Sequence, residues 1–349
     1  MKAFVMKRIG EVGLIDKPKP EAGPNDAILK PTKGLICTSD VHTVGGAIGE
    51  REDLTLGHEV VGVVDSVGSE VEQFSEGDRV VVGAITPDWG SDAAQRGFPS
   101  QSHGALGGWM FANVKDGTFA DYVHVNDADA NLAAIPEDVK DEEAVYVTDM
   151  LSTGFAGAEN AEIPLGGTVA VFAQGPVGLM ATKGAVLKGA GRIFAVETDP
   201  RRAELARKYG ADEVIDFQET DPVERIMELT GGRGVDSSIE ALGSSKTFED
   251  CVKVTRPGGT ISNIGYHGEG EFVRIPREGW GVGMSDQTIN TALCPGGRVR
   301  LERLLRLIKV GKVDPTPMTT HRFSFEDIVD GFELMKTKED GVIKPLIEF

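Results

Sequence analysis

The sequence is poor in cysteine, and no apolar segment of signal-peptide length occurs near its N-terminus. Its 349 residues include three cysteines, Cys37, Cys251 and Cys294, which lie far apart. An odd and sparse set cannot form a disulfide framework, so each is expected to be a core thiol or a metal ligand in a reducing compartment. Since no small-residue cleavage site is found either, the sequence predicts a cytoplasmic protein.

Basic residues are scarce relative to acidic ones. There are 36 Lys and Arg residues against 55 Asp and Glu residues, which gives a formal net charge of −19. Such a field repels phosphate groups, so neither nucleic acid nor an anionic membrane surface is an expected partner. The acidic excess fits an adaptation to high salt or simply an acidic surface.

Long hydrophobic runs are missing as well. The stretch 163–182 carries no charge, but Pro164, Pro176 and four glycines interrupt it. A buried strand followed by a turn explains this composition better than a membrane span does.

The apolar residues change their pattern along the chain, whose length predicts two domains. Short apolar runs at 56–68 and 77–84, bounded by Gly, Asp and Pro, are typical of a compact all-β unit. From Thr168 onward, strand candidates alternate with helix-length segments, which predicts a parallel sheet with helices on both faces. The predicted strands are 168–173, 192–197, 213–216, 235–240, 260–265, 288–293 and, at the C-terminus, 342–349. Caps and apolar spacing predict helices that begin at Pro200 and Pro222, a helix around 301–308, and one between Ser324 and Met335.

A glycine-rich turn follows the first of the alternating strands. Ala173, Gly175 and Gly178 form an A-x-G-x-x-G pattern before a helix-like segment, so backbone N–H groups and a helix N-terminus are available to a pyrophosphate. Glu197 ends the next strand, where a carboxylate can accept hydrogen bonds from ribose hydroxyls. A purely structural turn is the alternative, and the strand–helix context favours dinucleotide binding. The predicted cofactor-binding residues are Ala173, Gly175, Pro176, Val177, Gly178, Glu197, Thr198 and Asp199.

Candidate metal ligands occur in the β-rich part. Cys37 lies in the segment GLICTSDVH, and His58 with Glu59 lies in LGHEVVG. Zinc accepts thiolate, imidazole and carboxylate ligands. The spacing matches no specific zinc motif, so on the residues alone a buried core cysteine and a hydrogen-bonded core histidine remain alternatives.

These segments resemble a known family. GLICTSDVH, LGHEVVGVVDSVGSEV, the A-x-G-x-x-G turn and RPGGTISNIGY are similar to the zinc-dependent medium-chain alcohol dehydrogenases. TDMLSTGF (148–155) and LCPGGRVRLERL (293–304) further resemble the tetrameric secondary-alcohol dehydrogenases of bacteria and archaea. The resemblance implies an α/β fold with a doubly wound Rossmann domain at 153–294 and a β-rich, GroES-like catalytic domain at 1–152 and 295–349. It also implies a homotetramer.

The resemblance assigns roles to the candidate ligands. Catalytic zinc would be held by Cys37, His58 and Asp149, with Glu59 beside them as an exchangeable ligand or as a carboxylate just outside the coordination sphere. The fourth position would stay open for water or the substrate oxygen. The larger relatives bind a structural zinc through four cysteines in a lobe that corresponds to 88–120. This chain has none there, so one zinc per chain is expected.

A proton route and a substrate pocket are implied in the same way. Ser39 would take the proton of the alcohol and pass it through the nicotinamide ribose to His42, although a turn that begins a helix and a surface histidine fit the same residues. The implied pocket is mostly apolar, which suits a small ketone or secondary alcohol. Its residues are Ala84, Ile85, Trp109, Tyr266, Leu293 and Cys294.

The implied function is zinc-dependent interconversion of small secondary alcohols and ketones by hydride transfer to or from a nicotinamide cofactor. A polyol, sugar or threonine dehydrogenase of the same superfamily is an alternative, and its pocket should be more polar. A dinucleotide-binding protein without turnover is disfavoured, because it would have no use for the metal and relay residues together.

NAD is the expected cofactor. The subfamily binds NADP through a small residue, a hydroxyl residue and an arginine just after the second Rossmann strand, where this chain has Glu197, Thr198 and Asp199. At about 4 Å and an effective dielectric of about 20, each carboxylate would repel a 2′-phosphate by about 4 kcal/mol before screening. Arg201 and Arg202 could oppose this repulsion by turning toward the phosphate.

Overall fold

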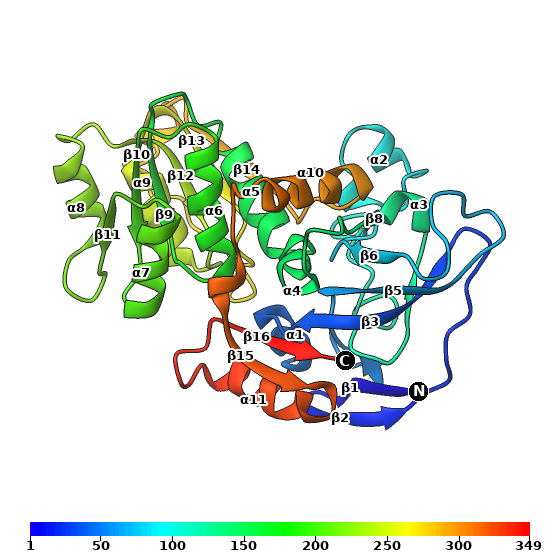
Figure 1. The fold of residues 1–349 in the computed structure, drawn as a ribbon. Coiled ribbons are helices and arrows are strands. Elements are labelled where there is room, and N and C mark those ends of the chain that lie inside the picture. Colours follow the sequence, from blue (N-terminus) through cyan, green and yellow to red (C-terminus); the bar gives the residue numbers. More distant parts are fainter. The chain divides into compact units, whose positions relative to one another are not determined.

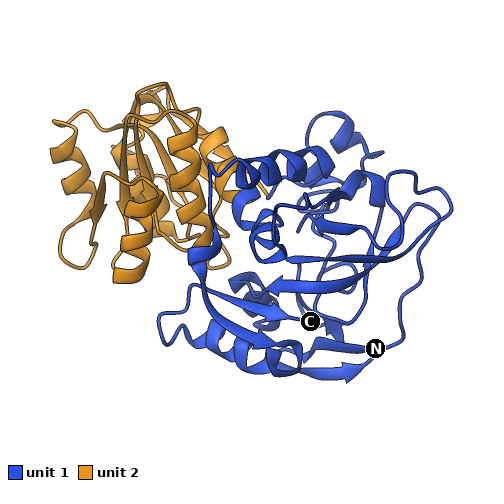
Figure 2. Ribbon diagram, in the orientation of Figure 1, with its two compact units in different colours: residues 1–152, 294–349 blue, residues 153–293 orange.

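The computed structural model describes all 349 residues, which fold into two compact units (Figure 1). Figure 2 shows unit 1, which comprises Met1–Ser152 and Cys294–Phe349, and unit 2, which comprises Thr153–Leu293. The second division falls one residue before the expected boundary at 294/295, because Cys294 bonds within unit 1. Its carbonyl accepts a hydrogen bond from the Ser100 hydroxyl. None of the helices combines the length and apolar character that a membrane span requires.

Unit 1 is built on two sheets. A seven-stranded sheet has the order β15-β16-β3-β5-β6-β8, with β7 also paired to β3, and a three-stranded sheet has the order β2-β1-β4. The C-terminal strand β16 pairs antiparallel with β3, so the last strand of the chain joins a sheet formed mostly by strands from residues 27–134. The strands are β1 (Lys2–Arg8), β2 (Glu11–Asp16), β3 (Ala27–Leu35), β4 (Leu54–Thr55), β5 (Val60–Val67), β6 (Arg79–Val82), β7 (Val123–Val125), β8 (Leu132–Ala134), β15 (Thr319–Ser324) and β16 (Lys344–Glu348).

Helices join these sheets, which corrects the expectation of an all-β unit. A short helix such as α4 has acidic residues in its first turn. The longer helix α10 buries the apolar residues whose spacing at 301–308 predicts a helix. The Ser324 hydroxyl accepts from the Asp327 amide, so the predicted cap precedes the last helix. The helices are α1 (Thr38–Val44), α2 (Asp92–Gln95), α3 (Ala128–Asn131), α4 (Asp141–Ala144), α5 (Met150–Asn160), which continues into unit 2, α10 (Arg298–Lys309) and α11 (Ile328–Thr337).

Unit 2 is a six-stranded parallel sheet with the order β11-β10-β9-β12-β13-β14, which confirms the predicted α/β doubly wound fold. Its order reverses between β9 and β12, and ligands of such sheets bind beyond the carboxyl ends of the strands at that point. Helix α6 packs with α7 and α8 with α9, and right-handed crossovers place the two pairs on opposite faces (Figure 1). The elements are β9 (Thr168–Phe172), α6 (Pro176–Leu187), β10 (Arg192–Val196), α7 (Pro200–Tyr209), β11 (Glu213–Ile215), α8 (Pro222–Leu229), β12 (Val235–Glu240), α9 (Ser245–Val254), β13 (Thr255–Asn263) and β14 (Thr288–Thr291).

Candidate functional site

Four potential metal ligands meet in unit 1. One donor atom each from Cys37, His58, Glu59 and Asp149 lies within 4.8 Å of the other three. We call these residues the ligand cluster. Strand pairing explains the meeting, because Gly34 in β3 is the register partner of Val60 in β5, so the residues after β3 lie beside those before β5. Asp149 joins them from the residue before α5.

The donors of the ligand cluster fit a zinc ion. The Nε2 atom of His58 lies 3.6 Å from an Asp149 oxygen and 3.7 Å from Oε1 of Glu59. Glu59 is fully buried, and its Oε2 atom has no hydrogen-bond partner. A buried carboxylate oxygen without a partner is costly, and a bound cation removes that cost. Thiolate, imidazole and carboxylate are the ligand types that zinc takes.

Asp40 holds two of these ligands in place, a role that the sequence did not reveal. Its Oδ2 atom accepts the Cys37 amide at 2.8 Å, and its Oδ1 atom lies 3.3 Å from Nδ1 of His58. The buried carboxylate thereby fixes the ring so that Nε2 faces the ligand cluster. A helix-start signal, an acidic residue three positions after the cap, predicts the bond to Cys37 but not the long-range contact with His58.

Lys344 is a second functional residue that the sequence did not reveal. Its Nζ atom lies 2.6 Å from Oε1 of Glu59, and both side chains are fully buried. Burial by itself lowers the pKa of this ammonium, but the anionic neighbours Cys37, Glu59 and Asp149 raise it above its ordinary value. The pair spans 285 residues of sequence, so no local pattern could have shown it.

The same charges shift the pKa values of the ligands. Burial raises the pKa of the Cys37 thiol, but Lys344 and His58 outweigh it and hold the pKa at about 7. Burial lowers the pKa of His58, but Asp40 and Asp149 raise it well above its usual range. Burial dominates at Glu59 and raises its pKa. A dication held by these residues would displace protons from them.

The residues expected to form the proton route share helix α1. The Ser39 hydroxyl lies 3.3 Å from Nε2 of His58, so the structure brings Ser39 to the ligand cluster. His42 follows one helical turn later and is exposed. Residues three positions apart lie on the same side of a helix.

Four of the six expected pocket residues belong to unit 1. The Ala84 amide donates to the Thr148 carbonyl, and the Cys294 thiol contacts the same carbonyl at 3.9 Å. Because Thr148 precedes Asp149, Ala84 and Cys294 both bond to the backbone next to a member of the ligand cluster. Ile85 is buried next to Ala84, and Trp109 is partly buried. Tyr266 and Leu293 belong to unit 2.

The predicted glycine turn lies at the carboxyl end of β9 in unit 2. Ala173 adopts the left-handed conformation with φ of 69°, where glycine is usual, and Pro176 begins α6. A Cβ atom on Gly178 would lie 2.0 Å from the Ala173 carbonyl oxygen, so only glycine fits there. Nothing lies within 4 Å of the space that a Gly175 side chain would fill. The turn thus has an open face for a ligand.

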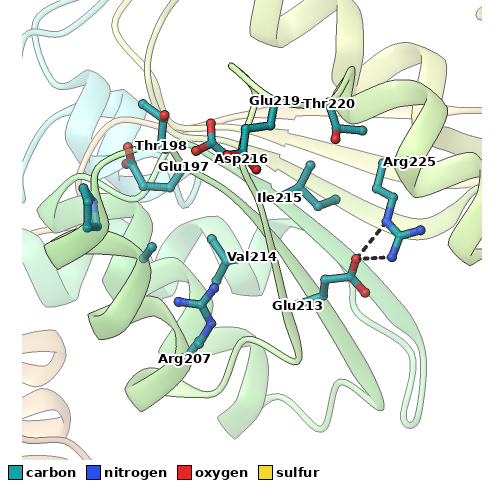
Figure 3. A pocket seen from close by; sticks show the side chains of 12 residues that line it. Glu197, Thr198, Arg207, Glu213, Val214, Ile215, Asp216, Glu219, Thr220 and Arg225 are labelled. Carbon is teal, nitrogen blue, oxygen red and sulfur yellow. Dashed lines mark hydrogen bonds and ion pairs between the residues drawn. The ribbon is translucent and has the colours of Figure 1, made fainter.

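Glu197 adjoins this turn at the end of β10. Its Oε2 atom accepts the Gln174 amide, and its Oε1 atom accepts the amides of Thr198 and Asp199. The Arg202 guanidinium lies 4.0 Å from the same carboxylate. A cavity of about 600 Å³ is lined by Glu197 and by residues of α7, α8 and β11 (Figure 3). It contains no residue of the ligand cluster.

Comparisons with known proteins extend over the whole chain. Residues 23–137 match the family model of the alcohol dehydrogenase GroES-like domain, and residues 176–309 match that of zinc-binding dehydrogenases. The chain is 52% identical over 349 residues to the NADP-dependent isopropanol dehydrogenase of Thermoanaerobacter brockii, which covers 99% of both proteins. It is 50% identical to the protein of the same name from Entamoeba histolytica, over 99% of this chain and 95% of that one. The solved structure of alcohol dehydrogenase TADH from Thermus sp. ATN1 matches with a TM-score of 0.90 at 30% identity, over 100% of this chain and 99% of that chain.

Replacing a ligand should remove the metal without unfolding the chain. We expect Cys37→Ser and His58→Ala to lose zinc, measured as metal content per chain, because each variant deletes a donor of the ligand cluster. Circular dichroism should remain unchanged, since the sheets of unit 1 have their own apolar core. Cys251→Ser, at a buried cysteine of unit 2, is the matched control and should keep its zinc. Full zinc content in Cys37→Ser would refute the assignment.

Neutralising Asp40 should weaken zinc binding while leaving the ligands in place. We expect Asp40→Asn to bind zinc about 10 to 100 times more weakly in a chelator competition, because His58 loses the carboxylate that orients it. The control is Asp26→Asn, since Asp26 lies 2.9 Å from another histidine, His124, outside the ligand cluster. Equal zinc affinity in Asp40→Asn and the unmodified protein would contradict the role of Asp40.

Proposed function

The chain belongs to the family of zinc-dependent medium-chain alcohol dehydrogenases, and we propose that it interconverts small secondary alcohols and ketones by hydride transfer to or from a nicotinamide cofactor. One observation carries this proposal: four residues that can supply zinc ligands bring their donor atoms together, and the residues bonded to the backbone before Asp149 are small. The names of the relatives from Thermoanaerobacter brockii and Entamoeba histolytica, both isopropanol dehydrogenases, support the same substrate class.

The proposed substrate site adjoins Asp149. Ala84 and Cys294 both bond to the Thr148 carbonyl, and Ile85 adds a further apolar side chain. Such a lining favours short alkyl groups and offers few hydrogen bonds to a polyol or an amino acid. These contacts argue against the polyol, sugar and threonine alternatives.

The proposed mechanism divides the work between the metal and the helix α1. Zinc held by Cys37, His58 and Asp149 would supply a Lewis acid that lowers the pKa of the alcohol. The Ser39 hydroxyl, beside His58, would accept the proton that the alcohol loses while donating its own proton to a ribose hydroxyl of the nicotinamide cofactor, from which His42 would receive one. His42, exposed one turn further along, is the proposed group that exchanges this proton with solvent.

The proposed cofactor site is in unit 2. The amides of the turn from Ala173 to Gly178, with Pro176 and Val177 at the start of α6, would hold the pyrophosphate at a helix N-terminus. Glu197 lies where a ribose would meet the end of β10. The open space in front of Gly175 supports this placement.

We further propose that NAD is preferred, although the two named relatives are NADP-dependent. Support comes from the side chains of this chain. Three backbone amides fix the Glu197 carboxylate, and the Asp199 carboxylate caps α7 by accepting the Arg202 amide. Because Arg202 already faces Glu197, it is a poor partner for an additional phosphate.

We also propose a cytoplasmic homotetramer. Three free cysteines support a reducing compartment. In unit 2, β14 is an edge strand, and the segment before it exposes Phe272, Val282 and Met284. Exposed apolar side chains and open strand edges are typical of contacts between subunits.

The substrate proposal predicts that a secondary alcohol is preferred over the primary alcohol with the same number of carbon atoms. We expect kcat/KM for 2-butanol to exceed that for 1-butanol by about tenfold or more, because the apolar lining fits the second alkyl group. Initial rates of cofactor reduction measure both values. A higher kcat/KM for sorbitol or threonine than for 2-butanol would replace the secondary-alcohol assignment.

The cofactor proposal predicts a kinetic ratio. We expect kcat/KM for NAD to exceed that for NADP by about tenfold or more, because a 2′-phosphate would meet two carboxylates. Glu197→Gly combined with Asp199→Arg should shift the ratio toward NADP. Glu219→Gln, at an exposed residue of the same cavity, is the control and should leave it unchanged. Equal or better use of NADP by the unmodified protein would overturn the preference.

A further inference from the structure

Lys344 and Glu59 form a buried ion pair beside the ligand cluster. Lys344 begins β16 and Glu59 precedes β5, and both side chains are fully buried at a separation of 2.6 Å between Nζ and Oε1. A buried ion pair of this kind is often no more stabilising than apolar residues of the same volume. Its position at the ligand cluster indicates a role there instead.

The Lys344 ammonium and the metal position share one carboxylate. Oε1 of Glu59, which contacts Lys344, is also 3.7 Å from Nε2 of His58, and Oε2 has no other partner. The charges of the ligand cluster are consistent with a Glu59 carboxylate that is shared between Lys344 and the metal. The thiolate of Cys37 and the carboxylates of Asp149 and Glu59 supply three negative charges, and a zinc dication with Lys344 supplies three positive ones. Without Lys344, a bound dication would be the remaining counter-charge for Glu59.

We propose that Lys344 is a positioning residue that keeps Glu59 an exchangeable ligand. Its ammonium competes with zinc for the Glu59 carboxylate, so that Glu59 can leave the metal when the substrate oxygen needs the position. Loss of this competition makes Glu59 a permanent ligand and closes the position. The inference rests on the proposed zinc-dependent function, but it concerns metal release and ligand exchange, which can be measured without substrate.

The first test measures zinc release from the fully loaded protein to an excess of chelator. We expect Lys344→Met to release zinc at least about tenfold more slowly than the unmodified protein, because an unpaired buried carboxylate then holds the dication. Lys344→Arg, which keeps the charge, should release zinc at nearly the original rate. Lys33→Met is the matched control, since Lys33 of β3 forms a partly exposed ion pair with Glu348, which lies on the same strand β16 as Lys344. Equal or faster release from Lys344→Met would overturn the proposal.

A double variant separates this role from a structural one. In the Glu59→Gln background, adding Lys344→Met should change the release rate less than about twofold, because the competing carboxylate is gone. If Lys344→Met slowed zinc release as much in the Glu59→Gln background as it does alone, Lys344 would act by another route and the proposal would be overturned. If Lys344→Met does not fold even with zinc, Lys344→Gln provides the same comparison.

A spectroscopic test measures whether an added ligand can bind the metal at the position that Glu59 would otherwise occupy. In the cobalt(II)-substituted protein, added imidazole should shift the visible absorption of the metal by entering that position. We expect Lys344→Met to need at least about tenfold more imidazole for half of the shift, and Glu59→Gln/Lys344→Met to return to the original concentration. An unchanged imidazole titration in Lys344→Met would contradict the proposal. Failure of the function itself would appear separately, as an unmodified enzyme that binds zinc but oxidises no secondary alcohol.

Discussion

The need to pair buried charge is the constraint on which the site depends. Glu59 is fully buried, and it is held between an ammonium on one side and metal-ligating groups on the other. Removing either partner would leave a carboxylate in a poorly hydrated interior, where charge is costly. The pairing of β3 with both β5 and β16 keeps the partners together, although they lie 285 residues apart in sequence. The fold of unit 1 therefore brings the Lys344 ammonium to the Glu59 carboxylate of the ligand cluster.

The two units position their functional groups in different ways. In unit 1, side chains from distant segments converge, and Asp40 ties the backbone of Cys37 to the ring of His58. In unit 2, backbone geometry dominates, because the glycine turn is defined by close packing and by the left-handed Ala173. A hydride transfer needs both: donors fixed in place around a cation, and amides that hold an extended anionic cofactor.

The sequence predicts the parallel sheet well, because its strands and helices follow local rules. The apolar pattern locates all six strands, and α7 begins at Pro200 as expected. Short helices in unit 1 were missed, since an acidic residue can begin four-residue helices inside a β-rich pattern. Asp40 and Lys344 were missed because their contacts depend on strand register, which no local spacing encodes. The zinc ligands came from the resemblance and not from spacing. The cofactor preference differs between the two kinds of evidence: the named relatives are NADP-dependent, whereas the carboxylates of Glu197 and Asp199 favour NAD.

Zinc K-edge X-ray absorption of the purified protein is the most direct test that the ligand cluster holds zinc, because it identifies the ligands of the metal independently of activity. We expect one sulfur neighbour at about 2.3 Å, from Cys37, and nitrogen or oxygen neighbours at about 2.0 to 2.2 Å, from His58 and the carboxylates. The sulfur neighbour should disappear in Cys37→Ser. Several sulfur neighbours, or a spectrum that Cys37→Ser leaves unchanged, would show that the ligand cluster does not hold the zinc.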